Sequence, residues 1–422
     1  MTRAAHLRKG WCPGALRPMR SGDGLLVRVR PRAGAFSLPA LRAVGAVAAQ
    51  FGSGEIDLTN RGNLQIRGVT DATFQPALAA LDSTGLLDAS AEAEAVRNIV
   101  VDPLSGIDPG RADVRLLAAG MEGILARDKR MWGLPAKFGF SLSGTSEPRV
   151  GDRDADVMIS ADADHFAIAL DGAPDVRCAI SRDEAIDAAH RLALTFVELN
   201  ENHAGFRRMR DAVARLGVAT VFAMSGLRMP VTRTTAARES RTPIGVEFYG
   251  GNTFAVGAGL PFGRITAHQL DALCMAAASH SERVHLSPER AFVFPVEDAE
   301  GCSALLHDAE MIGLITRKDD IRLAMDVCPG APACKSAVTD TRRDAERFAQ
   351  IFAGSLGGCS LHISGCEKGC ARRGKASFTL VGRCGRYDVI RNGPADASNV
   401  LETIKAEDIS DVISRLIMEP VT

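Results

Sequence analysis

The chain has 422 residues, of which 46% are hydrophobic, and its formal net charge is -1 at pH 7. A chain of this length and composition can bury a large core and should divide into two or more domains. No apolar run reaches the roughly 18 residues that a membrane-spanning helix needs, and the charged start MTRAAHLRKGWCPG lacks the apolar region of a signal peptide. We therefore expect a globular, cytoplasmic protein with no membrane partner.

The first 70 residues are basic although the whole chain is nearly neutral. They contain ten arginines and one lysine against three acidic residues, a net charge of +8. Such a segment could bind nucleic acid or a polyanionic small molecule, or its arginines could form a solvated surface. Few aromatic residues and no recognised nucleic-acid motif accompany the arginines. We therefore expect no nucleic-acid partner.

An internal repeat organises the chain. The stretch GAFSLPALRAVGAVAAQFGSGEIDLTNRGNLQIRGV, from Gly34, aligns with GRITAHQLDALCMAAASHSERVHLSPERAFVFPVE, from Gly263, with a one-residue gap. In both copies an N-cap, Ser37 or Thr266, opens a helix with apolar periodicity, and strand-like stretches lie before and after it. Each copy therefore predicts the order strand, helix, strand, strand. Two such half-domains could join their sheets about a pseudo-twofold axis.

Each copy of the repeat is followed by a stretch with mixed helix and strand signals. The first contains a helix opened by the capping box Ser181 to Glu184, and the composition of Pro230–Pro243 is typical of a linker. These signals predict an α+β protein made of duplicated modules. We expect half-domains at 1–80 and 236–301 and α/β domains at 81–235 and 302–422.

Four of the ten cysteines form two pairs. Cys328 and Cys334 lie in CPGAPACKS, and Cys366 and Cys370 lie in HISGCEKGCARRG, with 31 residues between the pairs. Four thiolates are the ligand set of a four-iron four-sulfur (4Fe-4S) cluster, the interpretation we favour, and the second pair would share a face if a helix began there. Structural zinc, which prefers a tighter C-x-x-C spacing, and unrelated buried thiols are the alternatives. The other six cysteines are interpreted as such thiols; Cys274 continues an apolar helix face.

Several motifs resemble those of the siroheme-containing sulfite and nitrite reductases. They are CPGAPAC, SGCEKGCAR, LTNRGNLQIRG, RNIVVDPLSGID and LPAKFGFSLSG, and the resemblance extends over nearly the whole chain. It implies two ferredoxin-like half-domains and two α/β domains related by a pseudo-twofold axis, the last of them carrying the 4Fe-4S cluster. The cysteine arrangement is the most specific part of this resemblance.

The resemblance also implies a tetrapyrrole pocket. By position in the family motifs, the residues that would line it are Arg61, Arg67, Arg97, Asn98 and Lys137. A uroporphyrinoid carries eight carboxylates, and guanidinium groups bind carboxylates bidentately. The alternative is that these are ordinary surface or ion-pair residues.

Two departures from the reductase pattern separate this chain from that activity. Gly139 stands where the reductases have a second lysine, which implies a weaker pocket for sulfite or nitrite. Glu367, Lys368 and Gly369 separate the second cysteine pair, where the reductases usually have a Pro-Asn type spacer. The reductases also bridge their last cysteine to the siroheme iron, a role that Cys370 need not share.

The sequence is most similar to the family branch that acts on precorrin-3A in aerobic cobalamin biosynthesis. That similarity implies a monomeric oxidoreductase of monooxygenase type, which uses O2 and an unidentified electron donor to hydroxylate carbon 20 and form a γ-lactone. It also implies a mononuclear non-haem iron, but the nine histidines show no ligand motif. The alternatives are a siroheme-dependent sulfite or nitrite reductase and a simple iron–sulfur electron-transfer protein.

Overall fold

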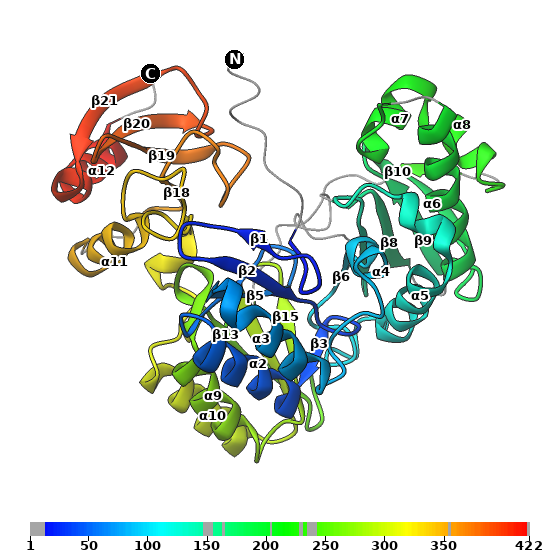
Figure 1. The fold of residues 1–422 in the computed structure, drawn as a ribbon, viewed down its shortest axis with the longest axis horizontal. Coiled ribbons are helices and arrows are strands. Elements are labelled where there is room, and N and C mark those ends of the chain that lie inside the picture. The colour runs from blue at the N-terminus through cyan, green and yellow to red at the C-terminus, as the bar shows by residue number, and fades with distance from the viewer. Residues whose placement is uncertain are drawn as a thin grey trace.

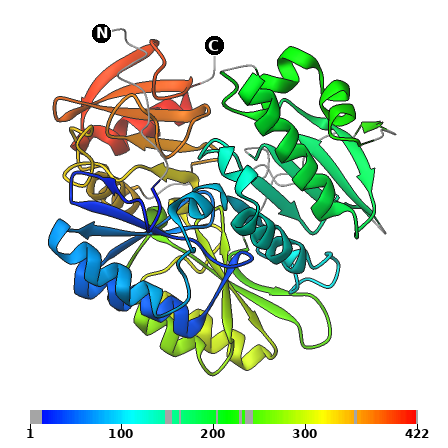
Figure 2. The same cartoon turned by 45° about the vertical axis from the view of Figure 1, so that its right-hand side comes forward.

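The computed structural model describes residues 13–146, 155–162, 165–202, 205–227, 231–233, 243–352 and 356–419. Three lobes are visible in Figure 1. The lower lobe combines the N-terminal part of the chain, in blue, with a later part, in yellow-green. Each of these two parts continues into one of the upper lobes. In Figure 2 the C-terminal lobe lies above the first segment, and the other upper lobe lies to its right. No helix in the described ranges is long and apolar enough to cross a membrane.

The lower lobe contains the two copies of the repeat, each built on a five-stranded sheet. The first sheet has the order β1 (Met19–Arg20), β2 (Leu25–Val29), β5 (Leu64–Val69), β4 (Glu55–Leu58) and β14 (Arg264–Thr266). The second has the order β12 (Gly245–Phe248), β13 (Phe254–Gly259), β16 (Ala291–Val296), β15 (Arg283–Ser287) and β3 (Ala35–Ser37). The helices of this lobe are α2 (Leu38–Phe51), α3 (Asp71–Asp82), α9 (Ala267–Ala277) and α10 (Ala299–Met311).

The two copies are joined by a reciprocal exchange of short strands. Strand β3 of the first copy pairs with β15 of the second, and β14 of the second pairs with β4 of the first. Each exchanged strand directly precedes its helix, whose N-cap is the predicted Ser37 or Thr266. The exchange covers one edge of each sheet, which removes exposed backbone donors and acceptors. The predicted junction of the half-domains about a pseudo-twofold axis therefore takes a form that the sequence did not indicate.

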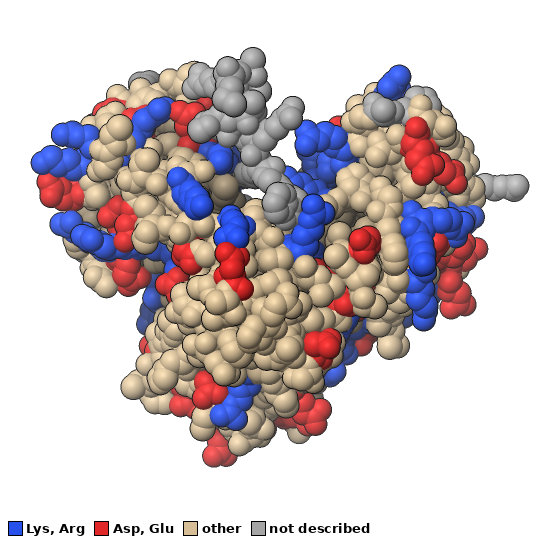
Figure 3. Space-filling model, in the orientation of Figure 1, with Lys and Arg blue, Asp and Glu red and all other residues tan. Residues whose placement is uncertain are grey.

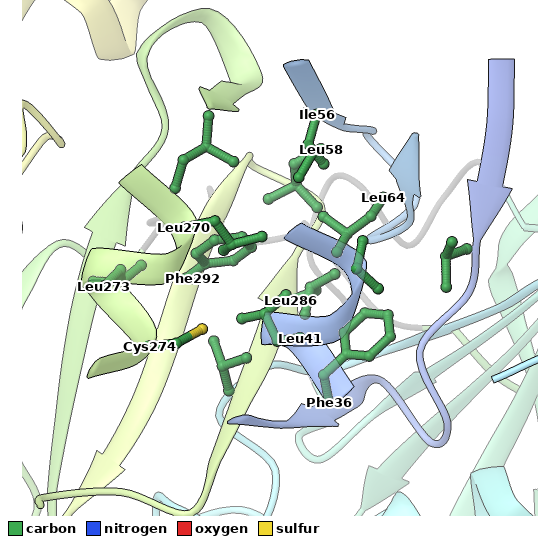
Figure 4. Packing of buried hydrophobic residues seen from close by; sticks show 14 of the residues in the cluster. Phe36, Leu41, Ile56, Leu58, Leu64, Leu270, Leu273, Cys274, Leu286 and Phe292 are labelled. Atoms are coloured by element: carbon green, nitrogen blue, oxygen red, sulfur yellow. The ribbon is translucent and has the colours of Figure 1, made fainter. Parts of the chain in front are cut away.

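One hydrophobic core runs through both copies. Helices α2 and α9 pack together, and Leu41, Phe36, Leu270 and Phe292 are each at most 2% exposed. Figure 4 shows these side chains converging with Cys274 in the same cluster. Cys274 is 3% exposed, and burial raises the pKa of its thiol to about 12. Its interpretation as a buried thiol is confirmed, as it is for Cys178 and Cys302. The same interpretation is wrong for Cys384, which is exposed, and for Cys359, which is only partly buried.

The sheets of the two upper lobes share the topology of five strands, and the first sheet has a sixth strand, β11. The first has the strand order β6 (Ile99–Val101), β7 (Phe140–Ser143), β8 (Val157–Asp162), β9 (His165–Leu170), β10 (Ala173–Ile180) and β11 (Val231–Arg233). The second has the order β17 (Met325–Val327), β18 (Leu361–Ser364), β19 (Ala376–Arg383), β20 (Arg386–Gly393) and β21 (Val400–Lys405). In both, the first three strands are parallel and the next two are antiparallel. The predicted duplicated α+β architecture is confirmed.

Helices cover both of these sheets. They are α4 (Ala91–Val96), α5 (Arg115–Arg127), α6 (Ala185–Asn202), α7 (Met209–Leu216) and α8 (Val218–Met224) in the first, and α11 (Thr341–Ile351) and α12 (Ile409–Met418) in the second. The predicted capping box before α6 is present, because the Ser181 hydroxyl accepts from the Glu184 amide and donates to its carboxylate. The predicted linker is wrong for residues 231–233, which form strand β11, and the rest of it lies largely outside the described residues.

Candidate functional site

The four cysteines lie on two neighbouring loops. Cys328 and Cys334 follow β17, and Cys366 and Cys370 follow β18, which pairs with β17 in parallel. Since the carboxyl ends of parallel strands meet at one edge of a sheet, both loops leave the same edge. The Gly365 amide donates to the Cys328 sulfur over 3.1 Å, and the Lys368 ammonium donates to the Ser336 hydroxyl over 2.9 Å. Both contacts hold one loop against the other.

The four thiols are near enough to influence one another. Burial, and then the neighbouring Cys370, Cys328 and Cys334, raise the pKa of the Cys366 thiol. Cys328 is buried and Cys370 is exposed, so the site extends from the interior to the surface. Four cysteines on two neighbouring loops, with a backbone N–H donating to one of the sulfurs, are the ligand type of a 4Fe-4S cluster. The residues therefore suit the cofactor that the sequence predicts.

The helix considered between the second pair of cysteines is absent. Residues 365–370 form bends and turns, and Gly369 has φ +51, a left-handed conformation that favours glycine. The loop instead passes over His362, which is fully buried and approaches the position that a Gly369 Cβ would occupy to 3.5 Å.

A second loop with corresponding contacts lies in the other α/β domain. Asp102 follows β6 as Cys328 follows β17, and Asp108 stands six residues further on, as Cys334 does. The Gly144 amide donates to the Asp102 carboxylate over 3.3 Å, which corresponds to the Gly365 contact with the Cys328 sulfur. The Arg111 guanidinium bridges Asp102 and Asp108, each at 2.8 Å. An internal ion triad therefore occupies the place that Cys328 and Cys334 hold in the C-terminal domain.

Three of the five predicted pocket residues come together. Arg61 and Asn98 line a hollow with Gly139 and Phe140. The Arg61 guanidinium donates to the Lys137 carbonyl over 3.4 Å, and the Asn98 amide donates to the carbonyls of Ala136 and Phe138, on either side of Lys137. Asn98 thus fixes the backbone that carries Lys137.

The other two predicted arginines contact protein groups elsewhere. Arg97 is 4% exposed, and its guanidinium forms a bidentate ion pair with Asp88 and donates to the Pro31 carbonyl. Arg67 is 1% exposed and pairs with Asp23 and Asp57. The alternative interpretation, in which such arginines are ion-pair residues, describes both positions in this structure. A substrate role for the five residues remains a prediction.

Gly139 forms part of the wall of the hollow. Its amide donates to the Asp156 carboxylate over 3.0 Å, and Asp156 is fully buried and paired with Arg208. A Cβ at this position would lie 3.3 Å from the Asn98 carbonyl oxygen and 3.8 Å from an Arg61 nitrogen. The glycine therefore leaves room beside Arg61 that a longer side chain would occupy.

Arg30 is a residue that the sequence interpretation did not single out. It is 3% exposed, lies beside Asn98, and pairs with Glu94 at 3.4 Å. Burial lowers its pKa to about 10; Nη1 is the atom that faces Glu94, and the Nε donor has no hydrogen-bond partner among the described residues. A buried guanidinium with an open donor, beside the Asn98 that lines the hollow, is suited to an anion. The basic first segment contained this signal, but nothing in the sequence distinguished Arg30 from its neighbours.

The basic charge of the first segment is partly neutralised within the fold. Arg20, Arg32 and Arg42 form ion pairs with Asp71, Asp88 and Asp271, all beyond residue 70. Figure 3 shows Lys and Arg side chains on both upper lobes where these face each other. A polyanionic ligand is therefore not needed to explain the whole charge of the segment.

No ligand set for a mononuclear iron can be named. Within the described ranges, no group of three or more His, Cys, Asp or Glu side chains could hold a single metal ion. The thiols of the two cysteine loops are likewise not gathered about one point, as zinc would require with each sulfur about 2.3 Å away.

Comparison with known proteins assigns the fold and the family. Residues 17–84 and 250–309 match the model of the nitrite/sulfite reductase ferredoxin-like half domain, which covers both copies of the repeat. A structure of the NirA protein of Mycobacterium tuberculosis superimposes with a TM-score of 0.74 at 19% identity, covering 93% of this chain and 80% of that one. These similarities define the architecture as that of the nitrite and sulfite reductases.

Individual relatives sharpen the assignment. A precorrin-3B synthase of Sinorhizobium sp is 30% identical over 398 residues, which cover 93% of this chain and 84% of the relative. A ferredoxin–nitrite reductase of Synechococcus elongatus is 23% identical over 98% of this chain and 89% of its own length. A ferredoxin-dependent sulfite reductase of Mycobacterium tuberculosis is 24% identical over 82% of this chain and 68% of its own length. The chain belongs to the nitrite and sulfite reductase family of oxidoreductases, within which it is similar to precorrin-3B synthase.

Proposed function

We propose that this protein is a precorrin-3B synthase. The observation that carries the proposal is the 30% identity to such an enzyme over 93% of the chain, in combination with Gly139 at the wall of the pocket. Holding a compact anion such as sulfite requires several converging cations, whereas a large polycarboxylate spreads its charge over many contacts. The glycine beside Arg61 removes one of those converging cations and so weakens the site for a compact anion.

The substrate would be precorrin-3A, bound at the hollow between the first half-domain and the first α/β domain. Arg61 and Arg30 would bind its carboxylates, and Lys137 would add a third cation on a backbone that Asn98 fixes. Arg67 and Arg97 would act on the scaffold, because their guanidinium groups already bind carboxylates of the protein.

The reaction would hydroxylate carbon 20 while the acetate of ring A closes to a γ-lactone. One atom of O2 enters the product and the other leaves as water, which takes two electrons from an unidentified donor and two protons from solvent. When bound by Cys328, Cys334, Cys366 and Cys370, a 4Fe-4S cluster would supply electrons one at a time. A mononuclear iron belongs to this proposal without assigned ligands.

The proposal is tested by anaerobic purification followed by incubation with precorrin-3A, an electron donor and labelled O2. We expect an iron and sulfide content of one 4Fe-4S cluster and a product that has gained one labelled oxygen atom by mass spectrometry. No turnover in the presence of an intact cluster and a competent donor would contradict the proposal.

A siroheme-dependent sulfite or nitrite reductase is the second candidate. It is favoured by the match to the nitrite and sulfite reductases over 82% or more of this chain. Extraction of pigment separates the two, since this candidate requires stoichiometric siroheme together with rapid reduction of sulfite or nitrite. The synthase requires neither.

A further inference from the structure

One carbonyl oxygen beside a predicted cluster ligand is held from outside its own domain. It belongs to Ala333, the residue before Cys334, and it accepts three hydrogen bonds from the first half-domain. The donors are the Ser21 hydroxyl at 2.6 Å, the Gly22 amide at 3.1 Å and the Arg67 guanidinium at 2.9 Å. These donors are remote in sequence, since Ser21 and Arg67 stand 312 and 266 residues away.

The position of Arg67 is fixed by two carboxylates. Its guanidinium binds Asp23 through two nitrogens, at 2.7 and 3.0 Å, and Asp57 through a third at 2.9 Å. Asp57 also binds Arg342 at 2.9 Å, on helix α11 that follows the first cysteine loop. The same carboxylate therefore links Arg67 to the helix that follows that loop. A guanidinium is rigid and planar, so its bonds to the two carboxylates also fix the direction of the N–H that donates to the Ala333 carbonyl.

The corresponding position in the other half-domain is a proline. In the first sheet Asp57 pairs with Gln65, and in the second sheet His285 pairs with Val293. When these two pairs are aligned, Arg67 on β5 corresponds to Pro295 on β16. Proline has no side-chain donor. The loop that faces that strand in the first α/β domain is instead closed by Arg111, its own residue. A side chain of the half-domain strand thus holds the cysteine loop, through Arg67, whereas the other loop is held by a residue of its own.

We infer that Arg67, supported by Ser21, is a positioning residue for the cluster ligand Cys334. It holds the Ala333 carbonyl so that the following thiol faces the other three cysteines. The inference rests on cluster binding, which both candidate functions share, and needs neither tetrapyrrole nor oxygen chemistry. It gives Arg67 a role different from the carboxylate binding that its motif implied.

The test compares the rate at which a strong iron chelator bleaches the cluster in the purified holoprotein. Ser21→Ala removes one donor to Ala333 and leaves every ion pair of Arg67 intact, so we expect about twofold to tenfold faster bleaching. Arg67→Lys keeps the charge but loses the fork, and we expect faster bleaching than in Ser21→Ala. Ser21→Thr keeps the hydroxyl and should restore the wild-type rate. Ser53→Ala is the matched control, because the Ser53 hydroxyl bonds the carbonyl of Arg67 itself and touches neither cysteine loop.

Thermal unfolding, recorded in parallel, separates positioning from general stability. We expect Ser21→Ala to bleach faster than Ser53→Ala while the two unfold at the same temperature. Equal bleaching of wild type, Ser21→Ala and Arg67→Lys would overturn the inference. So would an unfolded Arg67→Lys accompanied by a Ser21→Ala variant that bleaches like Ser53→Ala. Wild-type protein without iron and sulfide would overturn the cluster itself, whereas failure to convert precorrin-3A would affect only the proposed function.

Discussion

The two α/β domains present the same loop with different chemistry. In the C-terminal domain the loop after the first strand carries Cys328 and Cys334, and in the other domain it carries Asp102 and Asp108. Both loops make the same backbone hydrogen bond to the neighbouring strand, from the Asp102 amide to the Leu142 carbonyl at 2.9 Å and from the Cys328 amide to the Ile363 carbonyl at 3.2 Å, although the cysteine loop alone contains a cis peptide, at Ala331–Pro332. One loop offers thiols to a ligand, while the other is satisfied by its own Arg111.

The difference shows that the same loop position can carry either an internal ion pair or candidate cofactor ligands. Two carboxylates six residues apart need a cation, and Arg111 supplies it from within the loop. Two thiols at the same positions need no such cation, and four thiolates are the usual ligand set of an iron–sulfur cluster. We therefore expect the first loop to keep its shape without any cofactor and the second to depend on one.

The largest effect should follow from removing a cysteine of the C-terminal loops. Replacing any one of Cys328, Cys334, Cys366 or Cys370 by Ser should abolish the broad brown absorption of the cluster and the activity, because four-cysteine ligation leaves no spare thiolate. Iron and sulfide analysis measures this directly. The control is Cys384→Ser, an exposed thiol on the turn between β19 and β20, which should keep its colour. Full iron and sulfide in a Cys366→Ser variant would sink the assignment.

Breaking the corresponding triad should instead reduce stability and leave the cluster intact. Arg111→Ala removes the guanidinium that pairs with the Asp102 carboxylate, whose side chain is 1% exposed, so we expect a loss of about 3–5 kcal/mol in the free energy of unfolding. Adding Asp102→Asn should recover part of that loss, because the buried charge is then gone. Denaturant unfolding measures both variants. A cluster lost from Arg111→Ala before the protein unfolds would contradict the independence of the two loops.

Much of the fold could be predicted because its signals are local. Caps at Ser37 and Thr266 and the apolar periodicity that follows mark both helices, and the repeat then implies the duplication. The exchange of β3 and β14 could not be predicted in the same way. Each is a three-residue strand, AFS or RIT, and its partner belongs to the other copy. Pairing of such short segments is decided by tertiary packing.

The candidate site also has features with local sequence signals and features without them. The cysteine loops were predictable because proline, glycine and thiols occur together in a short stretch. The partners of Arg67 and Arg97 were not, since Asp23, Asp57 and Asp88 come from separate segments and only the folded chain brings them together. The spacing of Asp102 to Asp108 matches that of Cys328 to Cys334, and a proline follows the first residue of each pair. This correspondence is the one sequence signal that marks the place of the triad.

A smaller effect concerns the contact between the second half-domain and the loop that contains the triad. His285 is 2% exposed, and its Nδ1–H donates to the Pro103 carbonyl over 2.8 Å, since a carbonyl can only accept. Burial lowers the pKa of His285 from 6.5 to about 4. The neighbouring charges are Arg115, Arg283 and Asp113.

Between pH 6.5 and about 4, His285 is therefore protonated in the unfolded protein and neutral in the folded protein. This histidine should cost roughly 3 kcal/mol of stability as the pH falls through that window. His285→Asn keeps a donor for Pro103 without a titrating group, so its stability should fall less steeply with acid. Urea unfolding at a series of pH values measures the two slopes, and equal slopes would refute the role of His285.

The smallest expected effect is on substrate binding, and it is tested by comparing corresponding turns of the two half-domains. Arg61 lies between β4 and β5 and lines the hollow, and strand register places Glu289 at the same position between β15 and β16. If Arg61 binds a tetrapyrrole carboxylate, Arg61→Ala should weaken substrate binding by roughly 1.5–3 kcal/mol while the cluster spectrum stays unchanged. Arg61→Lys should recover only part of that loss, because an ammonium is a point charge without a planar fork. Glu289→Ala removes the corresponding side chain from the other turn and should bind precorrin-3A as wild type does, as measured by anaerobic titration. Equal binding by Arg61→Ala and Glu289→Ala would mean that the two turns do not differ in function and that Arg61 is an ordinary surface charge.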